Sequence, residues 1–213
     1  DEIPLNQIIV PGAHNSASHY VQLGFVTKCQ SKSVYDQLSE GNRYLDVRVS
    51  ANQNTSGLFL SHDFVLCRNS LALLNNTMYL NDYLRQCYQF LDEHPSETVL
   101  FVVKHEYGDI SISDLQYRLN RYIEEDPDYW LLTDTIPTLG EARGKLVLFR
   151  RYSDDAGLGP ESGISFRWSN QSGTEFQSEP AAETPFDNYT IFVQDWYEYD
   201  VNSKWLAFRI ANE

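Results

Sequence analysis

The sequence predicts an α/β fold with a mainly parallel sheet, and three observations support this. Short apolar runs alternate with amphipathic stretches and turn clusters along the first 150 residues. Several runs are continuous Val, Ile, Leu and Phe, which is typical of strands buried on both faces. The chain has 213 residues, of which 42% are hydrophobic and 14% aromatic, enough for a sizeable core. We therefore expect a single domain over residues 1–213.

The expected elements follow one another along the chain. Two stretches carry apolar residues at helical spacing, Tyr79–His94 and Ser113–Glu125, with Asn81 and either Ser111 or Ser113 as N-caps. The segment from Ser153 to Asp187 is rich in Gly, Ser, Glu and Pro and is expected to be a long loop. The expected strands are Gln7–Val10, Tyr44–Val49, Leu58–Leu60, Thr98–Val103, Lys145–Phe149 and Thr190–Val193.

The charge balance excludes one class of partner. Sixteen Lys and Arg stand against thirty Asp and Glu, a formal net charge of −14. Nothing supplies the basic stripe that a phosphate backbone needs, so nucleic acid is not an expected partner. No apolar run approaches the roughly 20 residues that span a bilayer. The chain opens with Asp1-Glu2, and we expect any signal peptide to have been removed.

Cysteines and glycosylation sequons indicate the compartment. The three cysteines, Cys29, Cys67 and Cys87, allow at most one disulfide and show no spacing typical of zinc. Acceptor sequons favour a secreted glycoprotein, although such triplets also arise by chance. We expect an extracellular, monomeric protein. The sequons begin at Asn54, Asn75, Asn170 and Asn188.

Polar side chains follow each expected strand where it ends. In a parallel sheet these ends share one face, so the side chains are expected to form one site. Cations concentrated in an acidic protein favour an anionic ligand. Two histidines with cations between them suit general acid–base cleavage of a phosphodiester, which needs no metal. The residues are His14, Arg48, His62, Lys104, Arg151 and Asp195.

These residues lie in motifs that resemble a known family. The segments 11–16 (PGAHNS), 41–48 (GNRYLDVR) and 60–62 (LSH) resemble the X region of phosphatidylinositol-specific phospholipases C. The segments 95–107, 143–153 and 193–197 resemble the bacterial, metal-independent branch in order and spacing. The resemblance covers nearly the whole chain.

The resemblance implies a distorted TIM-like barrel and a mechanism with two histidines. His14 would be the general base that activates the inositol 2-hydroxyl, and His62 would protonate the departing diacylglycerol oxygen. Arg48 would clamp the phosphate, and Asp46 would position a histidine or Arg48. The products would be inositol 1,2-cyclic phosphate and diacylglycerol, from phosphatidylinositol or from glycosylphosphatidylinositol anchors.

The resemblance also implies a substrate pocket and brief contact with membranes. Trp168 aligns with an aromatic residue of the family's rim and is expected to meet lipid headgroups. Asn15 stands where the bacterial branch carries an aspartate. The residues expected to bind substrate are Asn15, Lys104, Arg151, Asp195, Tyr197 and Trp168.

No cofactor is expected. The calcium-dependent relatives hold their metal at places that correspond here to Asn15, Asp46, Arg48 and Lys104. Two of these positions are cationic, and a cation in a ligand position repels Ca²⁺ and supplies its charge directly. The resemblance therefore implies a metal-free enzyme.

The chain also departs from the family in length. A complete barrel of this type takes about 250 residues, so the last strands are expected to be missing from this chain of 213 residues. The bacterial branch pairs the first histidine with a carboxylate near the chain end, and the sequence offers no strong candidate for it.

Two other functions compete with the leading hypothesis. The first is a non-catalytic module that binds lipid or sugar phosphate in the same pocket. The second is a metal-dependent glycerophosphodiesterase, which would carry an acid cluster such as Glu-x-Asp where this chain has Asp46-x-Arg48.

Overall fold

The computed structural model describes residues 1–21, 28–69, 76–152, 162–165, 182–183, 190–191, 193, 195 and 202. Three parallel strands form the centre of its main sheet, with β5 (Val99–Tyr107) between β2 (Tyr44–Ser50) and β7 (Leu146–Arg150). Their interiors are nearly continuous apolar runs and are mostly buried. The parallel core predicted from these runs is confirmed.

Shorter strands flank the central three. β1 (Gly12–Ala13) lies parallel to the start of β2, and β3 (Phe59–His62) lies antiparallel to its end. In the described part of the chain no pairing joins the two edges of this eight-stranded sheet, so it is open. The remaining strands are β4 (Val65–Leu66) beside β3, β6 (Trp130–Leu131) and β8 (Ile164–Ser165) beside β7, and the separate antiparallel pair β9 (Ala182–Glu183) and β10 (Thr190–Ile191).

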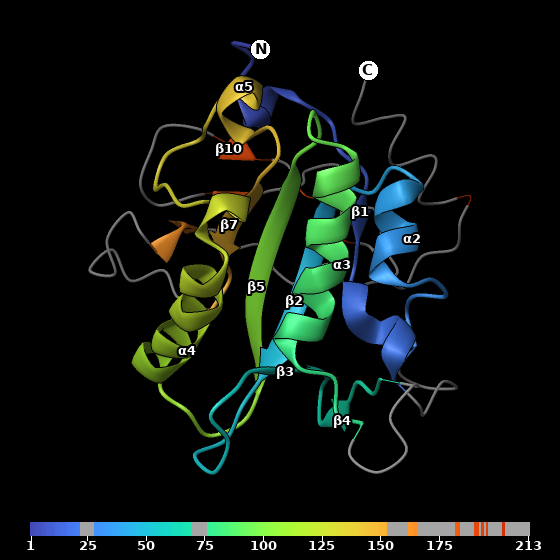
Figure 1. Cartoon of the computed structure of the whole chain (residues 1–213), viewed down its shortest axis with the longest axis vertical. Coiled ribbons are helices and arrows are strands. Elements are labelled where there is room, and N and C mark those ends of the chain that lie inside the picture. The colour runs from blue at the N-terminus through green and yellow to red at the C-terminus, as the bar shows by residue number, and fades with distance from the viewer. Residues whose placement is uncertain are drawn as a thin grey trace.

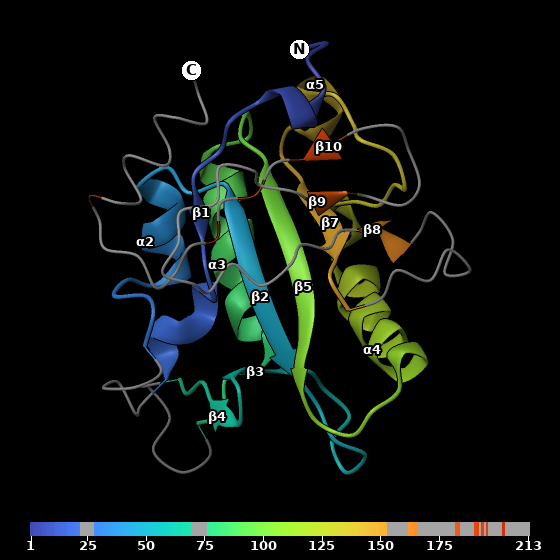
Figure 2. The same cartoon turned by 180° about the vertical axis from the view of Figure 1, so that it is seen from behind.

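The main helices cover one face of the sheet. α3 (Leu80–Glu93) and α4 (Ile112–Glu125) lie in front of the strands in Figure 1 and behind them in Figure 2. Ser111, one of the two predicted caps, caps α4 by accepting a hydrogen bond from the Asp114 amide at 3.1 Å, whereas Ser113 lies inside the helix. The shorter helices are α2 (Val34–Ser39) and α5 (Leu139–Ala142), with 3₁₀ turns at Leu5–Gln7, Ser16–Tyr20 and Pro127–Tyr129.

The alternation of side chains along the strands separates the core from the site. Leu45, Val47 and Val49 of β2 pack in the cluster that includes the apolar side chains of α3 and α4. Successive side chains of a strand point to opposite faces. Asp46 and Arg48 therefore lie on the face turned away from the helices, which Figure 2 presents to the viewer.

Three expectations about the elements were wrong. The first strand lies at Gly12–Ala13, because pairing begins only where the Pro11 carbonyl accepts the Arg43 amide at 2.9 Å. β3 runs antiparallel, since the eight residues 51–58 between β2 and β3 are too few for a parallel crossover of a dozen or more. Asn81 is not an N-cap, since α3 begins at Leu80 after the cap residue Tyr79.

Most of the segment expected to be a loop, Ser153 to Asp187, lies outside the described residues. Where that segment is described, it contains β8 and β9. No helix in the described residues is long and apolar enough to cross a membrane.

Candidate active site

His14 stands directly after β1 and is held through both ring nitrogens. Its Nδ1 lies 2.7 Å from Oδ1 of Asp195, and its Nε2 lies 3.0 Å from Nη2 of Arg48. A guanidinium only donates hydrogen bonds, so Nε2 is the accepting nitrogen. The ring proton is therefore on Nδ1, where it is donated to Asp195. This tautomer leaves Nε2 as the basic atom of the ring.

Arg48 connects three neighbours from its position on β2. Its Nε donates to Oδ2 of Asp46 at 3.1 Å, and its Nη1 donates to Oε1 of Glu106 at 2.8 Å. Burial of the guanidinium by itself would lower the pKa of Arg48, but the two carboxylates outweigh burial and raise it. Arg48 thus presents a permanent positive charge beside Nε2 of His14.

Asp46 fixes the turn that carries His14. Its side chain is only 2% exposed, and Oδ2 accepts the backbone N–H of Asn15 at 3.0 Å. Its backbone carbonyl accepts the Ser16 hydroxyl at 2.9 Å. On the other side, Nη1 of Arg151 lies 3.7 Å from Oδ1 of Asp46. Asp46 therefore holds both Arg48 and the turn after β1.

The buried carboxylate of Glu106 is a site residue that the sequence reasoning missed. It accepts Nζ of Lys104 at 2.6 Å and the backbone N–H of Asp63 at 3.2 Å, in addition to Arg48. Burial by itself would raise the pKa of Glu106, but Arg48 and Lys104 more than offset burial, so the pKa lies below its ordinary value. The signal in the sequence was Lys104-x-Glu106, two opposite charges at the spacing that shares a strand face.

A strand irregularity places Glu106 at this position. Arg48 pairs in register with Lys104 and Val49 pairs with His105, but Ser50 pairs with Tyr107. Glu106 is the extra residue, as in a β-bulge, which redirects a side chain. The contact between the Glu106 carboxylate and Arg48 therefore depends on this shift in the pairing register of β2 and β5.

His62 ends β3 and joins the same network through its chain neighbour. The backbone N–H of Asp63 contacts the Glu106 oxygen that also accepts Arg48. The ring nitrogen Nδ1 of His62 lies 3.9 Å from Sγ of Cys29, another neighbour that the sequence reasoning did not assign. Cys29 itself is held by its backbone N–H, which donates to the Ser18 hydroxyl at 3.0 Å.

Asn15 is buried beside this network. Its φ of 41° is a left-handed conformation that Asn tolerates better than most residues. Within the described residues neither side-chain polar atom of Asn15 has a hydrogen-bond partner, and the residue is 0% exposed. An unpaired buried amide costs about 1–3 kcal/mol, so its presence in a folded protein calls for an explanation, such as a catalytic role or a bound water or ion.

The structure therefore brings His14, Asp46, Arg48, Lys104, Arg151 and Asp195 into one connected set with Asn15 beside it, and links His62 to it through Asp63. Two predicted site residues, Tyr197 and Trp168, lie outside the described residues. The expectation that no carboxylate is available for His14 was wrong, because Asp195, which we had assigned to the inositol hydroxyls, contacts it across 181 positions of sequence.

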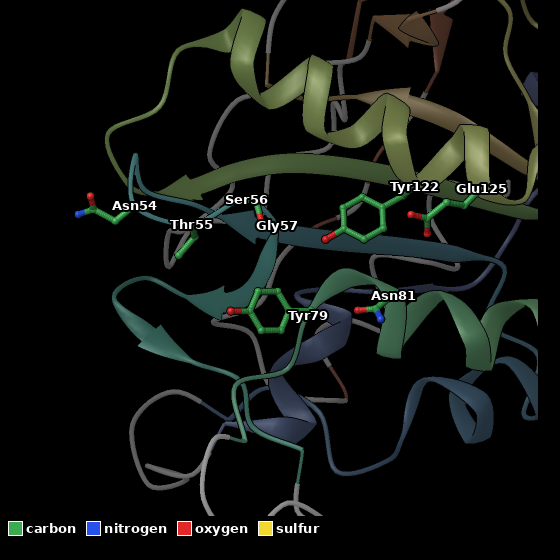
Figure 3. Close-up of a pocket in the computed structure, with 8 residues that line it drawn as sticks. All are labelled: Asn54, Thr55, Ser56, Gly57, Tyr79, Asn81, Tyr122 and Glu125. Atoms are coloured by element: carbon green, nitrogen blue, oxygen red, sulfur yellow. The ribbon is translucent and has the colours of Figure 1, made fainter.

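A cavity of about 500 Å³ lies elsewhere, on the helical side of the sheet. Figure 3 shows Tyr122 on α4 and Tyr79 at the start of α3 on opposite sides of it, with Asn81 and Glu125 beyond them. Its lining contains no histidine, lysine or arginine. The groups suited to phosphodiester chemistry are therefore not in this cavity but in the cluster around Arg48.

Comparison with known proteins gives concordant matches. The model of the PI-PLC X domain family (PI-PLC X 1) matches residues 5–161. Curated relatives include the 1-phosphatidylinositol phosphodiesterase of Listeria monocytogenes, 28% identical over 200 residues that cover 87% of this chain and 58% of the relative. The enzyme of the same name from Staphylococcus aureus strain Newman is 26% identical over 205 residues, which cover 91% of this chain and 61% of the relative. The chain thus spans about three fifths of the length of the curated relatives it matches.

Solved structures match as well. The phosphatidylinositol-specific phospholipase C from Listeria monocytogenes aligns with a TM-score of 0.56 and 30% identity, covering 71% of this chain and 54% of that chain. The phospholipase C from Staphylococcus aureus aligns with a TM-score of 0.68 and 23% identity, covering 98% of this chain and 68% of that chain. These likenesses confirm the predicted fold class, an α/β fold of the TIM-like barrel type.

Proposed function

Because this chain belongs to the PI-PLC X family, we propose that it cleaves phosphatidylinositol, free or in glycosylphosphatidylinositol anchors, into inositol 1,2-cyclic phosphate and diacylglycerol. The names of its relatives support this activity. The observation that carries the proposal is His14, with Asp195 on one ring nitrogen and Arg48 on the other. A base held in one tautomer beside a fixed cation suits attack on a phosphodiester.

The first half of the reaction uses His14. Nε2 takes the proton of the inositol 2-hydroxyl as that oxygen forms a bond to phosphorus, and Asp195 stabilises the resulting imidazolium through Nδ1. Arg48 turns its Nη2 from Nε2 to a phosphoryl oxygen, where charge develops. Asp46 and Glu106 keep the other guanidinium nitrogens in place during this turn.

The second half uses His62. As the bond between phosphorus and the diacylglycerol oxygen breaks, His62 gives that oxygen a proton and diacylglycerol leaves as a neutral alcohol. The phosphate is then closed in a five-membered ring with the 1- and 2-oxygens of inositol. His62 ends neutral and His14 ends protonated, so a proton exchange through solvent restores both for the next turnover.

The remaining residues of the site bind the inositol ring and the phosphate. Lys104 and Arg151 are cations that lie beside Glu106 and Asp46, and we assign them to the inositol hydroxyls. The buried amide of Asn15 is assigned to a phosphoryl oxygen, where its N–H groups would find the acceptor they lack among the described residues. Tyr197 and Trp168 keep the roles that the resemblance implies, stacking on the inositol ring and contact with headgroups.

We propose that this chemistry needs no metal ion. The carboxylates nearest to the phosphate site are already paired with cations, Asp46 with Arg48 at 3.1 Å, and Glu106 with both Arg48 and Lys104. A calcium ion at this place would have to compete with two fixed positive charges for the same oxygens.

We also propose that the protein acts outside the cell and carries glycans. Asn54, which opens one of the sequons, is exposed in a turn after β2, a position typical of an acceptor. Protein isolated from its natural source should migrate faster after enzymatic removal of N-linked glycans. An unchanged mobility would count against the glycoprotein.

The test of the activity is release of inositol 1,2-cyclic phosphate from radiolabelled phosphatidylinositol. We expect His14→Ala and His62→Ala each to lower the rate at least ~100-fold, the usual contribution of a general acid or base. His94→Ala, an exposed histidine at the end of α3, is the matched control and should leave the rate unchanged. Binding of inositol phosphate by the intact protein without any turnover would favour the non-catalytic module instead.

A further inference from the structure

Two buried hydroxyl groups join helix α3 to the turn that carries His14. The Tyr83 hydroxyl of α3 lies 2.6 Å from the Ser16 hydroxyl, and both residues are 0% exposed. The Ser16 hydroxyl also lies 2.9 Å from the backbone carbonyl of Asp46. In both Figure 1 and Figure 2 the turn that follows β1 lies beside α3. The helical layer therefore contacts the catalytic turn through this pair of hydroxyls.

The direction of each hydrogen bond follows from the number of donors. A serine hydroxyl has one proton, and a carbonyl oxygen only accepts, so the Ser16 proton is donated to Asp46. The bond between the two hydroxyls is then donated by Tyr83. Burial raises the pKa of Tyr83 well above its ordinary value, so the tyrosine stays protonated at neutral pH and remains a donor. Tyr83 therefore holds Ser16 with one directed bond.

The backbone of the turn at Asn15 needs such restraint. Its φ of 41° is a conformation that residues other than glycine rarely adopt, and it persists only where the surroundings hold it. Asp46 of β2 accepts the Asn15 N–H at 3.0 Å, and the side-chain amide of Gln37 on α2 donates to the Ser16 carbonyl at 2.9 Å. Tyr83 adds a restraint from α3, so the turn is held from the sheet and from two helices.

We propose that Tyr83 is a positioning residue for the catalytic base, and that its hydroxyl, acting through Ser16, fixes the place of the His14 ring. The proposal rests on the proposed function, in which Nε2 of His14 removes the proton of the inositol 2-hydroxyl. His14 lies two positions before Ser16, and its ring contacts Asp195 at 2.7 Å and Arg48 at 3.0 Å. A displacement of the turn would disturb both contacts and the approach of Nε2 to the substrate.

The ring of Tyr83 has a separate role in the core. It packs edge-to-face against the ring of Phe101, with 6.1 Å between the ring centroids. Tyr83→Phe would keep this packing, because only the hydroxyl reaches Ser16. Ser16 would still donate to Asp46 but would lose the bond that ties it to α3. The variant therefore tests the hydroxyl contact without emptying the core.

The first experiment measures kcat and KM for release of inositol 1,2-cyclic phosphate. Misplacing a catalytic group by about 1 Å can cost ~100-fold in rate, so Tyr83→Phe should lower kcat about tenfold and leave KM within about twofold. Tyr88→Phe is the matched control, because it removes a buried hydroxyl from the same helix, where Tyr88 accepts Nε1 of Trp130 at 3.0 Å. It should keep the wild-type kcat. An unchanged kcat in Tyr83→Phe would overturn the proposal, as would an equal loss in the control.

A double variant tests the route through Ser16. Ser16→Ala should lower kcat by a factor similar to that of Tyr83→Phe, since either change breaks the bond between the two hydroxyls. Adding Tyr83→Phe to Ser16→Ala should then lower kcat little further, because residues of one hydrogen-bond network are not additive. Losses of kcat that multiply in the double variant would overturn the route, since Tyr83 would then act on His14 without Ser16.

NMR of the full chain without substrate gives a readout that a purely structural role would not move. At a pH where the ring is neutral, the two ¹⁵N shifts of His14 report which ring nitrogen carries the proton. They should show one tautomer in the wild type and in Tyr88→Phe, and move toward each other in Tyr83→Phe as the bond to Asp195 loosens. Wild-type shifts in Tyr83→Phe would overturn the proposal.

This measurement also separates the two proposals, because it needs no turnover. If the wild type cleaves no phosphatidylinositol while Tyr83→Phe still changes the His14 shifts, the activity is refuted and the positioning role stands. If the wild type cleaves phosphatidylinositol and Tyr83→Phe changes neither kcat nor the shifts, the activity stands and the positioning role is refuted.

Discussion

Replacing Glu106 with glutamine removes one negative charge from the centre of the buried network. The side chain of Glu106 is 2% exposed and lies between Nη1 of Arg48 at 2.8 Å and Nζ of Lys104 at 2.6 Å. Removing one partner of a buried ion pair costs about 3–5 kcal/mol when the other charge is left uncompensated. In this variant Arg48 still has the Asp46 carboxylate as an ion-pair partner. The Lys104 side chain is 32% exposed, so water can solvate its ammonium group. We therefore expect a loss at or just below the lower limit of that range, about 2–3 kcal/mol.

The effect of Glu106→Gln on the unfolding free energy should depend on pH in a defined direction. Because the pKa of Glu106 is lowered from its ordinary value of 4.5, its carboxylate adds stability above that value, and this stability is lost as the pH falls through the lowered pKa. Glu106→Gln lacks this contribution at every pH. The difference in unfolding free energy between wild type and variant should therefore be full at neutral pH and shrink as the pH falls below 4.5.

Urea unfolding at neutral pH and in acid measures both effects. Glu124→Gln, which removes an exposed carboxylate on α4, is the matched control and should change stability by no more than about 0.5 kcal/mol. The reasoning would be refuted by a Glu106→Gln variant as stable as this control at neutral pH. A stability difference that does not change with pH would also refute it, because the loss would then not come from the charge.

The other predictions concern the base, the core and the metal. Asp195→Asn should lower kcat by about 10²–10⁴-fold, since the amide no longer holds the Nδ1 proton of His14; an unchanged kcat for release of cyclic phosphate would contradict the pairing. Phe101→Ala should cost about 3–5 kcal/mol in urea unfolding, because Phe101 is fully buried with its ring edge-to-face against those of Tyr83 and Trp130; a loss below about 1 kcal/mol would mean that the core closes around the gap. Treatment with EDTA should leave the release of cyclic phosphate unchanged, and a loss that Ca²⁺ restores would show that the site uses a metal after all.

Much of the scaffold was predictable because its signals are local. The apolar runs over β2, β5 and β7 predict strands buried on both faces. The apolar spacing, with Ser111 or Ser113 as the cap, predicts α4 to within one or two residues. Errors arose where the outcome depended on a partner strand. The first strand shifted to Gly12–Ala13 because its pairing with β2, and not its own composition, defines it.

The candidate site divides in the same way. His14, Arg48 and Lys104 could be chosen from sequence, because each is a polar group at the carboxyl half of a strand or directly after it. Glu106 was missed although Lys104-x-Glu106 signalled it; what the sequence could not show is its contact with Arg48, which depends on the register irregularity between β2 and β5. The partner of His14 could not be assigned either, since no local pattern relates it to Asp195.

The amino-acid sequence by itself determined the alternation of strands and helices, the acidic charge and the polar residue types at the strand ends, because propensity, periodicity and charge are properties of neighbouring residues. Only the tertiary structure decided which carboxylate meets which cation: Asp195 with His14, and Glu106 with Arg48 and Lys104. These pairs form through strand register and long-range packing, where a shift of one residue turns a side chain to the opposite face.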